Sequence, residues 1–458
     1  MSTETKFNKR VYGCAIIKSL NANYNADFTK QPRTLPNGIV YATDKALKYT
    51  IRHFLYKNYT DDKVLYFTRN KVATDKGQFV PMSLRELYMH LFGELEKVTK
   101  PNSSPKWMFY YFDGEKVEGV LQKIKPADIK KYYTDIEGFQ YASQLESYSK
   151  VANEKIKLNN VKLEGVEISD ETEPFYFYIK GEKEIVKIDI EEIDDIIKDL
   201  DLQFFGGYNK IKILYNLLNC VDVRLFGATY TGDTNVSIHG PVQINHGVDK
   251  FIHKDSGINT IYTEQIKSPV RNDKAKGGEA EMTTIGSSSK TMEAHYVHNF
   301  SINPKNLDDH VAIANELFKS QEKDKYPELF GLNKKDVKKL QEALRCGATL
   351  YDSTSKAGVE NELLIWIELN DDSKQVIPNL TELILITKGD SGKTNIDLTE
   401  VDKLLKQEHI TSQIKSVNLY FNDIYTKIEG IEEDNKVKFY PIELTNLKSD
   451  GNEQSNIS

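Results

Sequence analysis

The sequence opens with a run of apolar and β-branched residues, followed after a polar loop by apolar residues at helical spacing. Residues 9–20 (KRVYGCAIIKSL) have the composition of a buried strand. A loop covers residues 21–42, and Thr43 and Asp44 are good candidates to begin a helix that runs to about residue 57. The apolar positions that give this helix its period are Ala46, Leu47, Tyr49, Ile51, Phe54 and Leu55. Strand, long loop and helix are the opening of a βα unit.

Further strand and helix patterns alternate along the rest of the chain, separated by two long excursions. Strand patterns occur at residues 64–68, 222–230, 237–244, 260–266, 294–302, 362–369 and 382–386, and helical patterns at 83–95, 307–319, 334–345 and from about 398. We interpret the mixed segment 61–219 as an insertion. The glycine-rich segment 231–291 is typical of an extended β-hairpin arm. The simplest architecture is an α+β fold, a β-α-β-β-α-β sheet with these two insertions, ending in a polar, disordered tail from residue 449.

Composition narrows the class of protein. The chain has 458 residues, 39% hydrophobic and 28% charged, as in ordinary globular proteins. Its three cysteines have no paired spacing, which argues against a disulfide framework or a zinc finger and favours a cytoplasmic protein. We find no signal peptide, no apolar run long enough for a membrane span, and hence no membrane partner.

Charge is distributed unevenly. The net charge is −7, yet residues 1–60 hold ten Lys and Arg against three Asp and Glu. Residues 161–205 hold five Lys and Arg against fourteen Asp and Glu. A basic start beside an acidic later segment predicts one surface that attracts an anionic partner.

Three kinds of site can be set aside. Gly392-Lys393-Thr394 follows a strand, but Thr387 stands where a phosphate-binding P-loop needs glycine, and no helix begins at the Lys-Thr. The histidines lack the spacing of metal ligands, and no Gly-x-Ser-x-Gly elbow for a nucleophile is present. These histidines are His239, His246, His253, His295 and His298. We expect no metal, no cofactor and no catalytic residue.

The loop and the first helix carry the clearest binding signal. Lys45, Lys48 and Arg52 recur on one helical face while the apolar residues take the other. The preceding loop supplies amides, an aromatic ring and a guanidinium, through Asn21, Asn23, Tyr24, Asn25, Gln31 and Arg33. Amides and cations suit phosphate and ribose, and Tyr24 is placed to stack on a base. This combination favours binding of single-stranded RNA or DNA.

The glycine-rich arm adds a second set of such groups. It holds the run Gly286-Ser287-Ser288-Ser289, whose glycine permits close approach of a phosphate and whose hydroxyls donate to it. Its cations are Lys267, Arg271, Lys274, Lys276 and Lys290. The alternative interpretation is a flexible, solubilising loop.

Three blocks of sequence resemble family seven of the CRISPR-associated (Cas) proteins, of the RAMP superfamily, and most closely its type I-B branch. The first is the Asn-rich loop with Gln31-Pro32-Arg33, Gly38 and the helix start TDKALK at 43–48. The second is DVRLFGAT at 222–229, followed by GPVQ at 240–243. The third is 286–290 leading into 296–304, and the blocks cover about a third of the chain in the family's order.

The resemblance implies a palm like an RNA-recognition motif (ferredoxin-like), a helical finger insertion and a β-hairpin thumb. The implied ranges are palm 1–57, finger 58–215, palm strand 216–230, thumb 231–291, palm 292–448 and tail 449–458. It also implies RNA-binding roles for Arg224, Gly227, Ala228 and Gln243 in the second block, and for Gly286, Ser288, Ser289 and Lys290 in the third.

The implied function is that of the non-catalytic backbone subunit of Cascade, the type I interference complex used in antiviral defence. Many copies line one CRISPR guide RNA (crRNA) as a helical filament and present its bases for pairing with target DNA. The implied partners are guide RNA, target DNA, other copies of the chain, and the large, capping and guide-processing endonuclease subunits.

Two departures from the family pattern and two rival functions stay open. The first loop lacks the Pro and Gly that relatives carry there, and serines replace the Arg that relatives carry near the end of the thumb. The enzymatic alternative is metal-dependent RNA cleavage, as in type III backbone subunits, with Asp27 as the acting carboxylate. The other alternative is an RNA-binding module with no role in assembly.

Overall fold

The protein is described by a computed structural model that divides into two compact units. It describes residues 5–72, 77–95, 109–112, 117–119, 175–180, 184–188, 210–231, 234–252, 260–267, 284–315, 317, 326–389 and 392–444. The first unit comprises residues 1–93 with 212–458, and the second comprises 94–211. All candidate site residues belong to the first unit.

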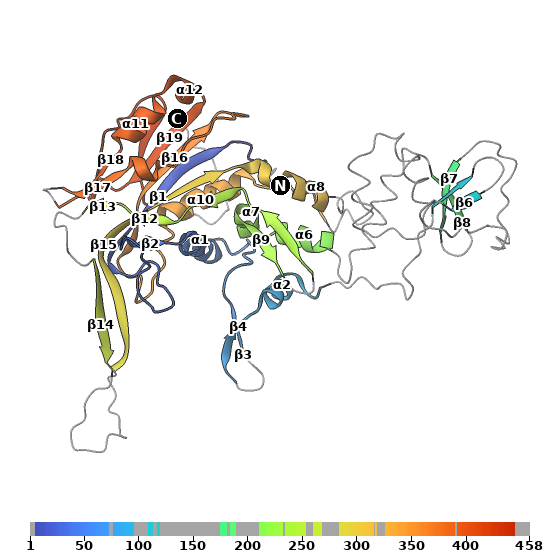
Figure 1. Ribbon diagram of the computed structural model, residues 1–458, viewed down its shortest axis with the longest axis horizontal. Helices are drawn as coiled ribbons and strands as arrows, with labels where there is room; N and C mark the ends of the chain where they lie inside the picture. The colour runs from blue at the N-terminus through green and yellow to red at the C-terminus, as the bar shows by residue number, and fades with distance from the viewer. Residues whose placement is uncertain are drawn as a thin grey trace, which may run out of the picture. The chain divides into compact units, whose positions relative to one another are not determined.

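A nine-stranded sheet forms the centre of the first unit (Figure 1). Its central strand β1 (Val11–Ala22) pairs antiparallel with β15 (Thr284–Ile302) on one side and with β16 (Val359–Leu369) on the other. These three strands confirm the strand patterns at 9–20, 294–302 and 362–369. Outer strands are β11 (Val242–Ile244), β12 (Gly247–Asp249) and β2 (Tyr41–Ala42) beyond β15, and β19 (Ile414–Phe421) and β21 (Val437–Pro441) beyond β16.

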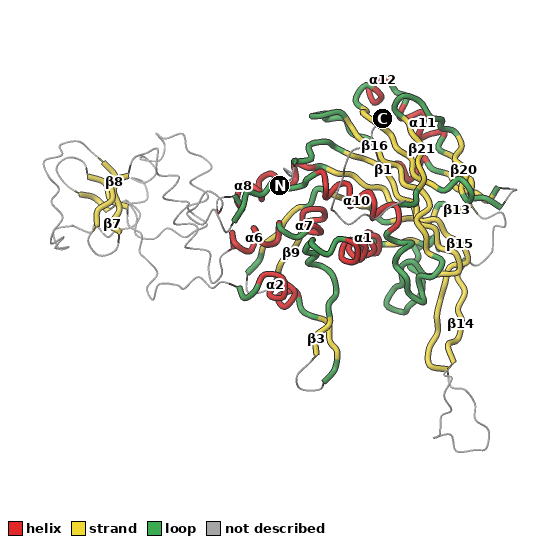
Figure 2. The backbone as a smooth tube through the Cα atoms, turned by 180° about the vertical axis from the view of Figure 1, so that it is seen from behind, coloured by secondary structure: helices red, strands yellow, loops and turns green. Residues whose placement is uncertain are grey.

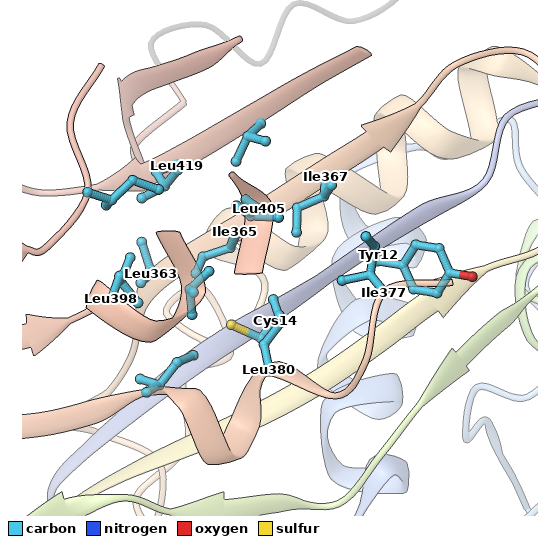
Figure 3. Close-up of a cluster of buried hydrophobic side chains, with 14 of the residues drawn as sticks. Tyr12, Cys14, Leu363, Ile365, Ile367, Ile377, Leu380, Leu398, Leu405 and Leu419 are labelled. Atoms are coloured by element: carbon cyan, nitrogen blue, oxygen red, sulfur yellow. The ribbon is translucent and has the colours of Figure 1, made fainter. Parts of the chain in front are cut away.

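Layers cover both faces of this sheet. On one face lie helices α1 (Asp44–Asn58) and α10 (Lys334–Cys346), which confirm the predicted helices at 44–57 and 334–345 (Figure 1). On the other face alternate residues such as Cys14, Ile365 and Leu419 enter a large apolar cluster (Figure 3). Burying each such side chain stabilises the fold by about 1.5–3 kcal/mol. The sheet therefore offers no open face to a ligand.

The layer over the second face is a small sheet with two short helices. Its order is β13-β17-β18-β20. The members are β13 (Phe251–Ile252), β17 (Leu385–Lys388), β18 (Thr394–Asp397), β20 (Thr426–Glu429), α11 (Thr399–Leu405) and α12 (Glu408–Thr411). Leu398, Val401 and Leu405 of this layer are buried in the apolar cluster that Figure 3 shows.

Two hairpins project from the same side of the first unit, one on either side of α1 (Figures 1 and 2). The longer pairs β14 (Ile261–Lys267) with the first half of β15. The shorter pairs β3 (Asn70–Val72) with β4 (Phe79–Pro81). Within the range 231–291 assigned to the thumb, β11 and β12 instead pair with the second half of β15 as part of the main sheet.

The remaining described elements of this unit are short. Ser83 and Glu86 cap α2 (Leu84–Phe92) reciprocally and confirm the helix predicted from residue 83. The others are α6 (Lys210–Leu218), α7 (Val221–Phe226), β9 (Gly227–Tyr230), β10 (Val236–His239), η2 (Pro304–Leu307), α8 (Asp308–Ala314) and η3 (Leu380–Leu383). Among the described residues, no helix has the length and apolar character needed to cross a membrane.

In the second unit the described residues form a four-stranded antiparallel sheet. Its order is β6-β5-β7-β8, from β5 (Phe109–Phe112), β6 (Val117–Gly119), β7 (Phe175–Lys180) and β8 (Glu184–Ile188). The insertion expected to be helical therefore contains strands as well.

The strand predicted at 64–68 is wrong, and the strand predicted at 222–230 is right only in its second half. Residues 222–226 belong to α7, and residues 227–230 form β9. Residues 64–68 form no strand, and the backbone N–H groups of Leu65 (2.8 Å) and Tyr66 (2.9 Å) donate instead to the buried carboxylate of Asp222. A third pattern, at 382–386, is shifted: the chain forms η3 there and the strand β17 starts at Leu385.

A buried charge network joins β15 to β16 and the small layer. His295 is fully buried, with Nδ1 2.5 Å from Glu362 Oε2 and Nε2 3.3 Å from Glu293 Oε1. Glu293 also accepts a hydrogen bond from Lys388 (3.0 Å). Burial lowers the pKa of His295, but the two carboxylates overcome that effect and raise it to about 8.

This network predicts a pH-dependent stability. The folded-state pKa of His295 lies above its unfolded value, so its stabilisation is present below about pH 6.5 and is lost as pH rises through about 8. The free energy of unfolding should fall by roughly 2 kcal/mol between pH 6 and pH 9. Urea unfolding at both pH values tests this, with His295→Gln as the variant that should flatten the profile. An equally steep profile in that variant would show that other groups are responsible.

Candidate nucleic-acid interface

The Asn-rich loop that leaves β1 is shaped by hydrogen bonds from its own side chains. Asp27 Oδ1 accepts from the backbone N–H of Thr29 (2.7 Å) and of Gln31 (3.0 Å). Hydrogen bonds, foremost from the Thr29 side chain, together with the Arg33 charge lower the pKa of Asp27. Asn25 Oδ1 accepts the backbone N–H of Thr43 (2.9 Å) at the start of α1. The Asp27 and Asn25 oxygens thus fix the loop.

The loop is attached to the base of the long hairpin. Asn23 Nδ2 donates to the carbonyl of Ser289 in β15 (2.9 Å) and to the carbonyl of Lys30 within the loop (3.2 Å). Asn21 adopts a left-handed conformation (φ 50°), and its Oδ1 accepts from the Tyr262 hydroxyl in β14 (3.3 Å). Two regions far apart in sequence, predicted separately to bind nucleic acid, therefore adjoin.

Tyr24 is not placed as predicted. Its side chain is 1% exposed, and its ring lies 5.1 Å from that of Tyr296, with its hydroxyl 3.3 Å from His298 Nε2. A ring must expose one face to stack on a base, so the stacking role assigned to Tyr24 is wrong. It anchors the loop to the sheet instead.

Arg33 and Gln31 lie where the loop reaches solvent. Gln31 is exposed, and Arg33 is half-buried. The Nε of Arg33 is buried and makes no hydrogen bond to any described residue. A buried donor of this kind normally has a hydrogen-bond partner.

The three cations of α1 differ in availability. Lys45 is exposed. Lys48 pairs with Asp44 (3.0 Å) one turn before it. The Nε of Arg52 lies 3.1 Å from the fully buried Asp222 carboxylate, and its guanidinium packs over the rings of Tyr66 and Phe226. Arg52 therefore has a structural role, and Lys45 is the most available cation of this face.

The second sequence block serves the fold. Arg224 makes two hydrogen bonds to the buried Asp336 carboxylate, Nε to Oδ2 (2.7 Å) and Nη2 to Oδ1 (2.8 Å), and so ties α7 to α10. Gly227 ends α7 at φ +75°, and a Cβ there would meet the carbonyl oxygen of Ile238 at 2.2 Å. Ala228 is buried. The structure thus gives Arg224, Gly227 and Ala228 packing roles, and the RNA contacts that the resemblance implies for them stay a prediction.

Gln243 and three residues of the long hairpin differ from one another in exposure. Gln243 is exposed, and its amide donates to the Gly240 carbonyl (2.8 Å). Ser289 is buried, with its hydroxyl 2.8 Å from that of Thr263, whereas Ser288 is half-buried. A Cβ at Gly286 would meet open space.

Lys290 pairs across the hairpin with Glu264 (3.0 Å). That contact raises the pKa of the Lys290 ammonium. The side chain of Lys267 and the whole of Arg271 lie outside the described residues, as do Lys274 and Lys276.

A lysine that the sequence did not single out lies beneath the loop. Lys356 Nζ donates to the carbonyl of Asn23 (2.8 Å) and to the carbonyl of Tyr24, and no described acidic side chain pairs with it. Burial lowers its pKa to about 8. The turn that carries it also bonds the loop, since the Asn23 backbone N–H donates to the Ser355 carbonyl (2.8 Å). In the sequence, this lysine is marked only by its place at the end of a polar run before a strand, Ser353-Thr354-Ser355-Lys356.

The described residues also bear on metal and nucleotide sites. No three His, Cys, Asp or Glu side chains among them come together as metal ligands. Gly392-Lys393-Thr394 leads directly into strand β18, and Lys393 Nζ donates to the carbonyl of Asp423 (2.8 Å). His295 and His298 are buried structural residues, and His253 lies outside the described residues.

The Arg224 pair gives a stability prediction. Arg224→Met leaves the Asp336 carboxylate buried without its cation, which should lower the free energy of unfolding by about 3–5 kcal/mol. Lys427→Met is the matched control, because it breaks an exposed pair with Glu429 (2.7 Å) and should cost under about 1 kcal/mol. Chemical denaturation measures both. Equal losses in the two variants would contradict the structural role of Arg224.

Known proteins of similar sequence or fold indicate the family of this chain. No curated protein matches the sequence. The fold is similar to a chain of a "CRISPR RNA-guided surveillance complex, pre-nicking" at 11% identity and a TM-score of 0.40, covering 94% of this chain and 96% of that chain. A chain of a "CRISPR RNA-guided surveillance complex" is similar at 11% identity and a TM-score of 0.33, with 94% and 95% covered. The family of CRISPR-associated protein Cas7 matches residues 9–404, and the chain therefore belongs to the Cas7 family.

Proposed function

We propose that this Cas7-family chain is the non-catalytic backbone subunit of a type I surveillance complex, of the type I-B branch, and that it binds guide RNA along the sugar-phosphate backbone. The observation that carries the proposal is the attachment of the 21–33 loop to the hairpin base through Asn23 and Ser289. This contact gathers the exposed amides of the loop, Arg33 and the hairpin into one surface. Such groups hold phosphate and ribose without reading bases.

The sheet order supports an RNA-recognition-motif-like palm. β1 lies between β15 and β16, β11 and β12 lie beyond β15, α1 follows β1, and α10 lies between β15 and β16 in sequence. This is the β-α-β-β-α-β arrangement, with the first strand between the third and the fourth. RNA-recognition motifs bind RNA on the open sheet face, but here both faces are covered. We therefore propose the loop and the hairpin as the surface that binds RNA.

We propose that several copies of the chain assemble along one guide RNA through this surface. A protein that grips the backbone leaves the guide's bases free to pair with target DNA. Repeated head-to-tail contacts between identical copies do not close, and so produce a helical filament. We propose the large, capping and guide-processing endonuclease subunits as further partners, in the cytoplasm.

Cleavage by Asp27 has less support than binding. One Asp27 oxygen, Oδ1, accepts hydrogen bonds from the backbone and side chain of Thr29 and from the backbone of Gln31. One carboxylate does not orient a metal ion by itself. Asp27 is therefore proposed to shape the loop.

Salt dependence tests the backbone grip. Arg33→Gln and Lys45→Gln should each weaken binding of single-stranded RNA of any sequence, and each should reduce the slope of log affinity against log salt by about 0.7. Lys374→Gln, at an exposed lysine in the loop between β16 and η3, is the control and should change neither the affinity nor the slope. Fluorescence anisotropy at several salt concentrations measures this. Unchanged slopes in both variants would remove this surface from the site.

The same samples separate the rival functions. Wild-type protein incubated with labelled complementary RNA and Mg²⁺ should leave that RNA intact. Regular cuts that Asp27→Ala abolishes would establish the enzymatic alternative. Native mass measurement with guide RNA should show several copies on one strand, whereas a single copy would indicate a lone RNA-binding module.

Lys356 adds a pH dependence to RNA binding. A bound phosphate near the loop favours the protonated ammonium, whose pKa in the free protein is about 8. RNA affinity should therefore fall as pH rises from 7 to 9, by roughly fivefold, or about 1 kcal/mol. Lys356→Met should remove this dependence and Lys374→Met should retain it. A pH profile that is the same in wild type and Lys356→Met would contradict a role for this lysine.

A further inference from the structure

The solvent-facing side of α1 alternates cations with aromatic rings. Lys45, Tyr49, Arg52 and Tyr56 are spaced four, three and four residues apart, and at 100° per residue they share one face. All four are exposed or half-buried, whereas Leu47, Ile51, Phe54 and Leu55 are buried on the opposite face. Tyr49, which looks like an apolar core position in sequence, in fact belongs to the outer face.

The rings on this face form a ladder that includes Phe67. The Phe67 ring stacks on Tyr56 (centroids 4.4 Å apart, planes at 24°) and lies nearly parallel to Tyr49 (6.1 Å, 26°). Tyr351 meets Tyr49 edge-on at 5.4 Å. Tyr49, Tyr56, Phe67 and Tyr351 are each half-buried, so each keeps accessible surface. Half-buried rings arranged in parallel are a surface on which a further flat ring can stack.

Two polar atoms beside the ladder have no hydrogen-bond partner in the described part of the chain. His53 Nδ1 and Arg69 Nη1 are buried and make no hydrogen bond with the described residues. The Arg69 guanidinium lies 5.3 Å from the Tyr56 ring, and the His53 ring lies 4.8 Å from Tyr351. Buried polar atoms of folded proteins almost always have a partner, so a donor and a ring nitrogen left over beside exposed rings indicate a ligand with both polar groups and a flat face.

The ladder lies next to the proposed backbone grip. The Asn25 side chain of the loop accepts the backbone N–H of Thr43 at the start of α1 (2.9 Å), and Lys45 belongs to both surfaces. The two hairpins project on either side of this helix (Figures 1 and 2). A strand held by the loop can therefore continue along α1, where Lys45 is exposed and available for a phosphate and the rings follow, while Arg52 is held by Asp222. Rings beside a cation are the pattern by which proteins hold single-stranded nucleic acid, with rings for bases and cations for phosphates.

We propose that Tyr49, Tyr56 and Phe67 form a stacking platform for unpaired nucleobases of the bound single-stranded RNA. His53 and Arg69 contact the polar edges or the phosphate of the same nucleotides. The platform does not select bases, because every base has a flat face. This inference rests on the proposed function and adds base stacking to its backbone grip.

Two oligonucleotides of equal length separate stacking from backbone binding. One is ordinary single-stranded RNA, and the other is abasic, with the ribose-phosphate chain but no bases. The full-length Tyr49→Leu/Tyr56→Leu variant should bind ordinary RNA about tenfold more weakly or worse, and abasic RNA as well as wild type does. Tyr425→Leu, at a tyrosine that is 64% exposed in the small layer, is the matched control and should bind both like wild type.

The outcomes distinguish the two proposals. Wild type that binds neither oligonucleotide would overturn the proposed function itself. Wild type that binds both with equal affinity, with no loss in the double variant, would overturn the platform alone. Normal RNA affinity in the double variant, together with loss of multi-copy assembly on guide RNA, would instead assign the rings to a protein contact and also overturn the platform.

A measurement on wild type removes any dependence on how the variant folds. RNA carrying 2-aminopurine should lose fluorescence on binding, because stacking on an aromatic ring quenches it. Quenching should be absent with Tyr49→Leu/Tyr56→Leu at saturating concentration, and thermal unfolding of that variant should resemble wild type. Binding without quenching in wild type would overturn the platform.

Discussion

The pairing of one long strand with two different partners holds the candidate site together. β15 runs from Thr284 to Ile302, pairing with β14 over its first part and with β1 from Thr291 onwards. The hairpin is thus a continuation of the central sheet. At the changeover Thr291 is fully buried and donates to the Ala22 carbonyl (2.9 Å), where β1 gives way to the loop. The positions of the loop and the hairpin are therefore both set by the same three strands.

This constraint explains why so many polar groups near the loop are used internally. The side chains of Asn23, Asn25 and Asp27 make hydrogen bonds that fix the loop. The Lys356 ammonium donates to the Asn23 carbonyl of the same loop. The polar side chains of this region that remain at the surface include Asn21, Lys30, Gln31, Arg33 and Lys45. A rigid loop that presents few cations suits a protein that must hold any guide sequence, since the loop need not reorder when it binds.

The sequence predicted the elements whose periodicity is strong and local. β1, α1, β15, α10 and β16 were all identified, because their apolar alternation or helical spacing is continuous. Residues 222–226 were misassigned as a strand, because the contacts that make them helical come from distant partners. Asp222 binds Leu65 and Tyr66, and Arg224 binds Asp336, 112 residues away. A motif can be specific to a family and still serve packing, as Arg224 and Gly227 do here.

At the candidate site, the residue types in the sequence predicted the kind of chemistry, but they did not predict which side chains are exposed. Tyr24 and Tyr49 are both tyrosines near the loop, yet the first is buried and the second faces solvent, and only the fold separates them. Hydrogen-deuterium exchange with and without single-stranded RNA shows where the strand binds. RNA should slow exchange at backbone amides of residues 25–33 and 286–291, on the loop and the adjoining hairpin strand. Protection confined to other regions, with these amides unchanged, would contradict the proposed RNA-binding surface.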